Sequence, residues 1–336
     1  MTDPLYWLPE ELEPIAFRLA RADECAYEIG DLTSAWSSNS PVRMYETVDS
    51  GIVTAKVDSI RPIPPKVALL FSEAINHIRA SIDNVVWYLV EKEVGVLDPQ
   101  TELLVVFPIT RDSTHFSSWC AKRVKNGLTM FAEDSGLGRR LRTLQPWQDT
   151  ISRVPSSSLS FSAIRRQPVE HAGALTLLQK YSNSDKHRSV KLTVSRTFSS
   201  HYDRPIFDQD LSPQLLTPGV TIHQIKQGEM SLLELNTAAV VVRPEPFTEF
   251  VNPVSEINWL RKYASETVIP MLLVGLTLDR GLPPNIDLSD TGETYRERLS
   301  DAGQDDAIER LRRLLIERLG AAMDANVSFM EKRTQG

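Results

Sequence analysis

The most regular pattern of hydrophobic positions in the chain lies between residues 65 and 94. Apolar residues recur there at spacings of four and three: Phe71, Ile75, Ile78, Ile82, Val85 and Leu89. This spacing places them on one face of an α-helix. Pro64 and Pro65 precede the pattern, where the missing N–H of proline costs nothing, and Gly95 follows it, as is typical of a helix C-terminus. The pattern predicts a helix from about Pro65 to Val94.

Hydrophobic positions favour helices at six other places. These helices are predicted at 14–36, between Asp112 and Asn126, at 136–144, at 169–184, at 255–278 with a kink at Pro270, and at 305–326. Three polar stretches, 151–167, 201–218 and 281–304, show no period and are expected to be loops or linkers. The chain is therefore predicted to be mostly helical.

Alternating apolar and β-branched residues predict strands in two parts of the chain. A β-hairpin is expected at 42–48 and 52–60, around the turn Asp49-Ser50-Gly51. Further strands are predicted at 190–198, 220–225, 231–235 and 238–242, with Gln227-Gly228 joining the second of these to the third. Residues 103–107 are expected to be a short strand or an extended segment.

These elements together predict an α+β protein, mainly a helical bundle with one or two small antiparallel β-sheets. Residues 1–188 are expected to form a helical half with the hairpin at 42–60 inserted in it. Residues 189–336 are expected to form β-strands followed by two long helices. We expect the two halves to pack into one unit.

Composition and charge narrow the class of protein. Of the 336 residues, 41% are hydrophobic and 24% are charged, which is typical of a soluble globular protein. The net charge of −7 argues against a general nucleic-acid coat protein, but it is compatible with a local basic cleft. The two cysteines, Cys25 and Cys120, lie far apart, and neither a signal peptide nor a long apolar run is visible. We expect a cytoplasmic protein without a membrane segment.

Metal and nucleotide sites have no support in the sequence. The six histidines form no HxH or HExxH pattern, and neither cysteine stands at ligand spacing from a histidine. The chain also has no P-loop, no GxGxxG and no GxSxG motif. We therefore expect neither a metal ion nor a cofactor.

One polar cluster lies on the helix predicted at 65–94, with three members beside its apolar face and Asn84 on a third side. Its members are Asn76, Arg79, Asp83 and Asn84. Arg79 and Asp83 are four residues apart, so their side chains can pair on the helix surface. Two interpretations stay open: the pair orders the packing of the helices, or Arg79 faces a shared cleft and serves a function.

A second polar cluster stands at the end of the helix predicted at 169–184. It consists of Asp185, Lys186, His187 and Arg188. A helix C-terminus stabilises a cationic imidazole, and His187 beside cations has the parts for acid–base chemistry at a phosphodiester. The alternative is a charged cap, in which these side chains bind the last carbonyl groups of the helix.

The most basic stretch of the chain lies between Trp119 and Trp147. It contains Lys122, Arg123, Lys125, Arg139, Arg140 and Arg142. Acidic residues in the stretch are limited to Glu133 and Asp134. A solvated helix face and a phosphate-binding surface, with Arg139 and Arg140 as candidate contacts, both explain this pattern.

Four short motifs carry a resemblance to a group of uncharacterised bacterial proteins. The motifs are Asn76 to Asn84, Phe107-Pro108-Ile109, Leu144-Gln145-Pro146-Trp147 and Asn183-Ser184-Asp185-Lys186-His187-Arg188. They resemble elements that read HNLRSALDH, FPI, LQPY and DKHR in that group. The resemblance covers roughly residues 60–190 and implies no activity.

The first motif is also similar to the signature of HEPN helical-bundle proteins, an arginine and a histidine separated by four to six residues. Many of these proteins are metal-independent ribonucleases of toxin or phage-defence systems and act as dimers. Arg79 matches the arginine, but Asn84 stands where the histidine is expected, and asparagine cannot transfer a proton. His187 is the best substitute.

Two hypotheses of function follow from these clusters. The first is a HEPN-like cytoplasmic homodimer that acts on RNA, with Arg79 and His187 as catalytic residues. The second is a non-catalytic binding or scaffold protein whose Arg, Asp and His clusters are structural.

Overall fold

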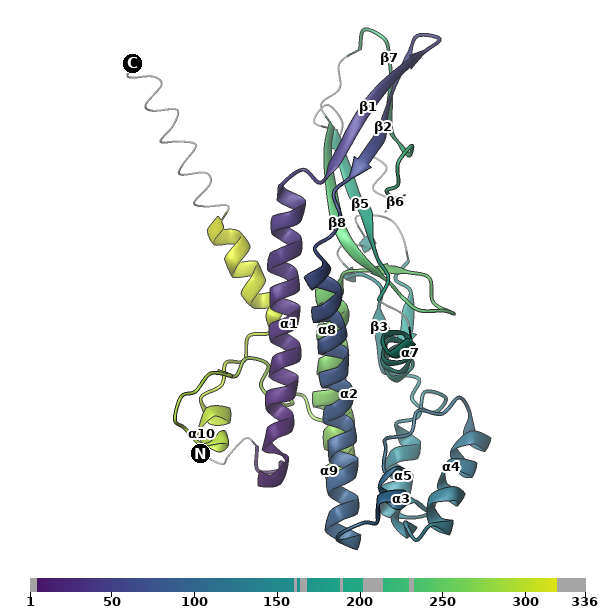
Figure 1. The fold of residues 1–336 in the computed structure, drawn as a ribbon, viewed down its shortest axis with the longest axis vertical. Helices are drawn as coiled ribbons and strands as arrows, with labels where there is room; N and C mark the ends of the chain where they lie inside the picture. Colours follow the sequence, from purple (N-terminus) through teal and green to yellow (C-terminus); the bar gives the residue numbers. More distant parts are fainter. Residues whose placement is uncertain are drawn as a thin grey trace.

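The computed structural model describes residues 5–159, 162–163, 168–187, 190–201, 214–229 and 233–318, with only the backbone for 185–187, 197–201 and 233–234. Long helices form the body of the molecule (Figure 1). They are α1 (Glu13–Ser38), α2 (Pro65–Val94), and a helix built from α8 (Pro253–Lys262), the π-helical segment η4 (Tyr263–Val268) and α9 (Ile269–Val274). The periodicity at 65–94 predicted α2 correctly.

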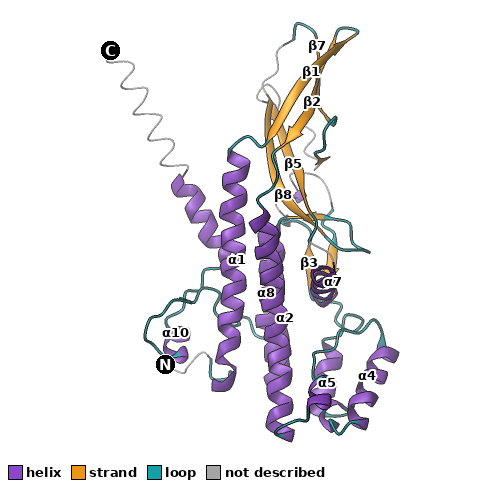
Figure 2. Ribbon diagram, viewed as in Figure 1, coloured by secondary structure: helices purple, strands orange, loops and turns teal. Residues whose placement is uncertain are grey.

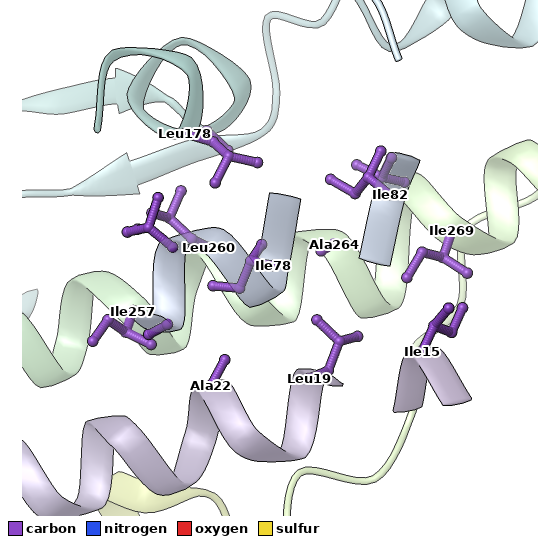
Figure 3. Packing of buried hydrophobic residues seen from close by; sticks show 14 of the residues in the cluster. Ile15, Leu19, Ala22, Ile78, Ile82, Leu178, Ile257, Leu260, Ala264 and Ile269 are labelled. Carbon is purple, nitrogen blue, oxygen red and sulfur yellow. The ribbon is translucent and has the colours of Figure 1, made fainter. Parts of the chain in front are cut away.

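The core lies between these helices and α7 (Ala174–His187) (Figure 3). Ile78 and Ile82 of α2 belong to the apolar stripe of the sequence, and both are fully buried. The other labelled residues come from α1, α7 and the α8–α9 helix: Ile15, Leu19, Ala22, Leu178, Ile257, Leu260, Ala264 and Ile269. Burial of these apolar side chains favours packing of the four helices.

In the part of the chain that the structure describes, three antiparallel sheets accompany the helices (Figure 2). The first has the order β1-β2-β7, and its hairpin extends past the end of α1: β1 (Val42–Asp49), β2 (Ile52–Ile60) and β7 (Thr221–Lys226). The second has the order β6-β5-β8-β9: β6 (Gln214–Leu215), β5 (Leu192–His201), β8 (Leu233–Val242) and β9 (Phe250–Val251). The third pairs β3 (Arg153–Pro155) with β4 (His171–Gly173).

Shorter helices flank the bundle. Beside the end of α2 lie α3 (Pro99–Glu102), α4 (Ser113–Lys125) and α5 (Gly136–Thr143). Helix α4 begins where the Asp112 carboxylate accepts a hydrogen bond from the His115 N–H, as the sequence predicted. Helix α10 (Tyr295–Ser300) and a last helix at 307–318 pack against α1. Short 3₁₀ turns lie at Glu10–Leu12, before α1, and at Thr129–Phe131, between α4 and α5.

The predicted fold class is confirmed: the protein is α+β, with a large helical part and small antiparallel sheets. Several element predictions were wrong in detail. Residues 103–107, expected to be a short strand or an extended segment, contain no strand, and 103–104 form a turn. Residues 153–155 form a strand inside the expected loop, and the helix after it begins at Ala174. Residues 281–304 include α10. The described residues contain three sheets, not one or two.

The strands near Gln227-Gly228 differ from the prediction. Strand β7 pairs with β2 of the hairpin, although β8 follows it in the chain. The two strands expected at 231–235 and 238–242 are one strand, β8.

A π-helical segment, Tyr263–Val268, directly precedes the turn that contains Pro270, where a kink was expected. Proline has no N–H, so Pro270 cannot donate to the carbonyl of Glu266 four residues earlier. The N–H of Leu278 donates to that carbonyl at 2.8 Å. The hydroxyl of Ser265 also accepts a hydrogen bond from the N–H of Leu282 at 2.6 Å. The chain after α9 therefore folds back and donates hydrogen bonds to the Glu266 carbonyl and the Ser265 hydroxyl of the π-helical segment.

Candidate functional site

Arg79 and Asp83 form the predicted ion pair. Arg79 Nε lies 2.9 Å from Asp83 Oδ2, and Nη2 lies 3.2 Å from Oδ1. The pair also binds both backbone groups of Phe107: Nη2 donates to its carbonyl at 2.7 Å, and its N–H donates to Asp83 Oδ1 at 2.9 Å. The side chain of Arg79 is only 14% exposed. The ion pair therefore fixes the chain segment that follows α3.

A buried glutamine holds the next residues of the same segment. Gln145 Nε2 donates to the carbonyl of Pro108 at 3.0 Å, and Oε1 accepts hydrogen bonds from the N–H and the hydroxyl of Thr110, each at 2.9 Å. Trp147 Nε1 donates to the Thr110 hydroxyl at 3.0 Å. We call Arg79, Asp83, Gln145 and Trp147, with the segment 107–110 that they bind, the clasp. Three of the four sequence motifs meet in it.

The remaining candidates of the two polar clusters lie elsewhere on α2 or at the end of α7. Asn76 is exposed and Asn84 is half-buried on α2. Asp185, Lys186 and His187 end α7, but their side chains lie outside the described residues, as does all of Arg188. The pairing of Arg79 with His187 therefore stays a prediction.

Two arginines of the basic stretch point into the protein rather than toward solvent. Arg123 is buried, donates to the carbonyl of Leu104 at 3.1 Å and lies 4.0 Å from the centre of the Trp119 ring. Arg140 donates to the carbonyls of Leu272 and Leu273 at 2.8 and 3.2 Å. The last carbonyls of α9 lack donors within the helix, so a guanidinium satisfies them well.

An exposed part of the basic stretch remains on α4 and α5. Lys122, Lys125, Arg139 and Arg142 are exposed. Arg142 lies 3.4 Å from Glu133. The expected basic surface is therefore smaller than the sequence suggested and does not include the guanidinium of Arg140.

Sequence reasoning missed a cavity of about 780 Å³ beside the second sheet. Its walls come from β3 and the loop after it, from β4, β5, β8 and β9, from α8 as far as Trp259, and from residue 308. Val240, Phe250 and Trp259 give it an apolar side, and Arg153 gives it a cationic side, which His171 also lines. The signals that could have indicated it were the run of serines at 156–158 and an exposed tryptophan on a buried helix.

Glu256 in the wall of this cavity belongs to a buried ion pair. Arg243 Nε and Nη2 donate to the two oxygens of Glu256, each at 2.9 Å, and both side chains are almost completely buried. The Tyr181 hydroxyl donates to Glu256 at 3.0 Å. Burial raises the pKa of Glu256, and the donors from Arg243 and Tyr181 oppose that rise. The charge of Glu256 is thus compensated within the protein.

The described part of the chain contains no group of three or more His, Cys, Asp or Glu side chains that could hold a metal ion. Within the same residues, no helix is long and apolar enough to cross a membrane. No protein-family model, curated protein or solved structure matches the chain. The comparisons assign neither a family nor a function, so the resemblance to HEPN proteins stays a prediction.

Proposed function

We propose that the protein is a non-catalytic binding protein in which the Arg79–Asp83 pair is structural. The observation that carries this proposal is that the Arg79 guanidinium already binds a carboxylate and a carbonyl of the protein. Asp83 compensates its charge, and the carbonyl of Phe107 takes a second hydrogen bond from Nη2. A phosphodiester at Arg79 would have to compete with these partners.

The proposal is tested by replacing the two members of the pair, alone and together. Asp83→Asn and Arg79→Gln each leave partly buried polar groups without partners, so each should lower the free energy of unfolding by about 1–3 kcal/mol. The double variant should lose less than the sum, because both changes remove the same interaction. Chemical denaturation measures these values.

Glu133→Gln is the matched control. It removes the exposed ion pair with Arg142, which should contribute less than about 1 kcal/mol. Equal stability of wild type, Arg79→Gln and Asp83→Asn would contradict a structural role. Cleavage of RNA by the wild type in EDTA, lost in Arg79→Gln and His187→Gln with folding intact, would replace our proposal with the HEPN-like ribonuclease hypothesis.

A second candidate function is RNA binding at the basic side of α4 and α5. It is favoured by the exposed positions of Lys122, Lys125, Arg139 and Arg142. Binding through phosphate contacts should weaken steeply with salt and on Lys122→Glu or Arg139→Glu. Arg140→Glu is not a clean test, because it would also disturb the end of α9. Binding that does not depend on salt would reject this candidate.

The expected homodimer is also part of the proposal. Strand β1 stands at the edge of its sheet, and all but one of its eight residues are exposed. Exposed edge strands offer unpaired backbone groups to another chain. Arg43 and Asp49 near its two ends would lie opposite each other in an antiparallel pair of copies. Light scattering measures the mass, and Thr47→Pro in β1 should shift a dimer toward the monomer; a monomeric wild type would reject the homodimer.

A further inference from the structure

We propose that the cavity beside β8, β9 and α8 binds an amphipathic organic anion. This inference rests on the proposed binding function and names the chemistry of the ligand. The apolar body of the ligand would lie against Val240, Phe250 and Trp259, and its anionic group would lie at Arg153 and His171.

The size and construction of the cavity suit a small organic molecule. Its volume of about 780 Å³ falls within the range of roughly 300–1,000 Å³ that is usual for small-molecule sites. Its walls combine segments that are far apart in the sequence, from Arg153 to Ile308. Such a site exists only in the folded chain, so its shape is set by the packing of the sheet on α8.

The apolar side of the cavity contains aromatic surface that the fold leaves uncovered. Phe250 is 38% exposed and Trp259 is 45% exposed, while Val240 of the same wall is buried. Large aromatic side chains lose contact with water when an apolar ligand covers them, and this favours binding. A ligand with a flat or extended apolar body would use this surface.

The polar side of the cavity has an uncompensated positive charge. Arg153 donates through Nε to the carbonyl of Thr150 at 3.3 Å, and no carboxylate in the described residues pairs with it. His171 lines the cavity beside it and is exposed. Glu256, the acidic residue of the wall, is already bound to Arg243. An anionic group would therefore find a cation and donors but no free carboxylate.

The N-terminus of α8 also favours an anionic group in the cavity. Asn252 and Ser255 line the cavity, and Asn252 caps the helix by accepting a hydrogen bond from the Ser255 N–H at 3.1 Å. The N-terminal end of a helix carries a partial positive charge. The side of the cavity at the N-terminus of α8 thus also favours a negative group.

Two fluorescent probes with the same apolar body test the proposal on the full chain. 1-Anilinonaphthalene-8-sulfonate carries a sulfonate, and N-phenyl-1-naphthylamine lacks it. The sulfonate probe should bind one site about tenfold more tightly, as expected for one hydrogen bond to a charged group. Trp259→Phe should reduce energy transfer from tryptophan to the bound probe, because Trp259 lines the cavity.

Substitutions in the cavity wall distinguish binding of the probes in the cavity from binding elsewhere on the surface. Arg153→Gln should weaken the sulfonate probe about tenfold and leave the neutral probe unchanged. Val240→Trp puts a larger side chain into the apolar wall and should weaken binding of both probes by about tenfold. Arg111→Gln is the control, since Arg111 is an arginine with a side chain 76% exposed that does not line the cavity. Circular dichroism confirms that each variant is folded.

Equal affinity for the two probes, or an unchanged affinity of Arg153→Gln for the sulfonate probe, would overturn the inference. If Val240→Trp and Trp259→Ala bound both probes with the affinity of the wild type, the inference would also be overturned, because the probes would then lie elsewhere. None of these results bears on the role of Arg79. That role is tested separately, by RNA cleavage and by the stability of the Arg79 variants.

Discussion

At the residue scale, two buried or partly buried charges among the described residues have partners within the protein. Glu256 has Arg243 and Tyr181 as partners, and Arg79 has Asp83 and the carbonyl of Phe107. Charges removed from water are tolerated only where such partners replace it. The fold therefore depends on several ionised side chains that hold distant segments together.

His77 is a half-buried titratable group that should make stability depend on pH. Burial lowers its pKa, although Glu73 at 3.7 Å opposes the shift, and Nδ1 has no hydrogen-bond partner in the described residues. The unfolded chain binds this proton near pH 6.5, and the folded chain binds it only at lower pH. Protonation thus favours unfolding as the pH falls through about 6.5.

His77→Gln removes this titration. Between about pH 7.5 and about pH 5.5, wild type should lose more free energy of unfolding than the variant. Denaturant titrations at both values measure the difference, with His115→Gln on the exposed side of α4 as the control. A parallel loss of stability in wild type and His77→Gln would show that another group titrates.

The sequence predicts contacts within one helix better than contacts between elements. Arg79 and Asp83 could be paired from their spacing, because one turn of helix brings them together. Their contact with Phe107 could not, because it depends on where the chain returns after α3. Arg139 and Arg140 are adjacent in the sequence, but only the packing of α5 on α9 decides that Arg140 binds carbonyls of α9.

At the element scale, the strands that escaped prediction have specific physical causes. Strands β3 and β4 have three residues each, too few to show alternation. Strand β8 was divided at Asn236 and Thr237, two polar residues opposite the irregular register of β5. A bulge breaks the alternation without ending the strand. Long helices were predicted well because many turns repeat the same signal.

Helix α5 offers a test of close packing with an internal control. A Cβ atom on Gly138 would overlap the carbonyl oxygen of Ala132, and the Gly138 N–H already donates to the Ser135 hydroxyl at 2.8 Å. Gly138→Ala should therefore lower the free energy of unfolding by about 1–3 kcal/mol. Gly136→Ala meets no atom and should be neutral or stabilising by up to about 1 kcal/mol. Thermal melting compares them, and equal effects would reject this account of the packing.

At the scale of the whole molecule, the last helix is fixed to the bundle by a buried network. Asp23 of α1 is 1% exposed and lies between Arg261 of α8, at 3.4 Å, and Arg310 of the last helix. It also accepts a hydrogen bond from the N–H of Ala307 at 3.1 Å. Gly30 has no side chain, which lets Leu311 approach α1 closely. One aspartate thus joins three segments that are distant in sequence.

Asp23→Asn should be among the more damaging single changes in the protein. Burial lowers the pKa of Arg261, and Asp23 opposes that effect, so removal of the carboxylate leaves a buried guanidinium without compensation. Loss of one partner from a buried pair lowers stability by about 3–5 kcal/mol. Trypsin should also cleave sooner within 310–318, because the last helix loses an attachment at its first turn.

Asp305→Asn is the matched control for this change. Asp305 pairs with Arg313 at the start of the same helix, but both side chains are largely exposed, so the loss should stay below about 1 kcal/mol. Urea denaturation and timed proteolysis measure both variants. If Asp23→Asn and Asp305→Asn lost the same stability, the last helix would be held mainly by its apolar contacts, above all that of Leu311 with Gly30. Gly30→Leu would then speed cleavage of the last helix by trypsin, and Asp23→Asn would not.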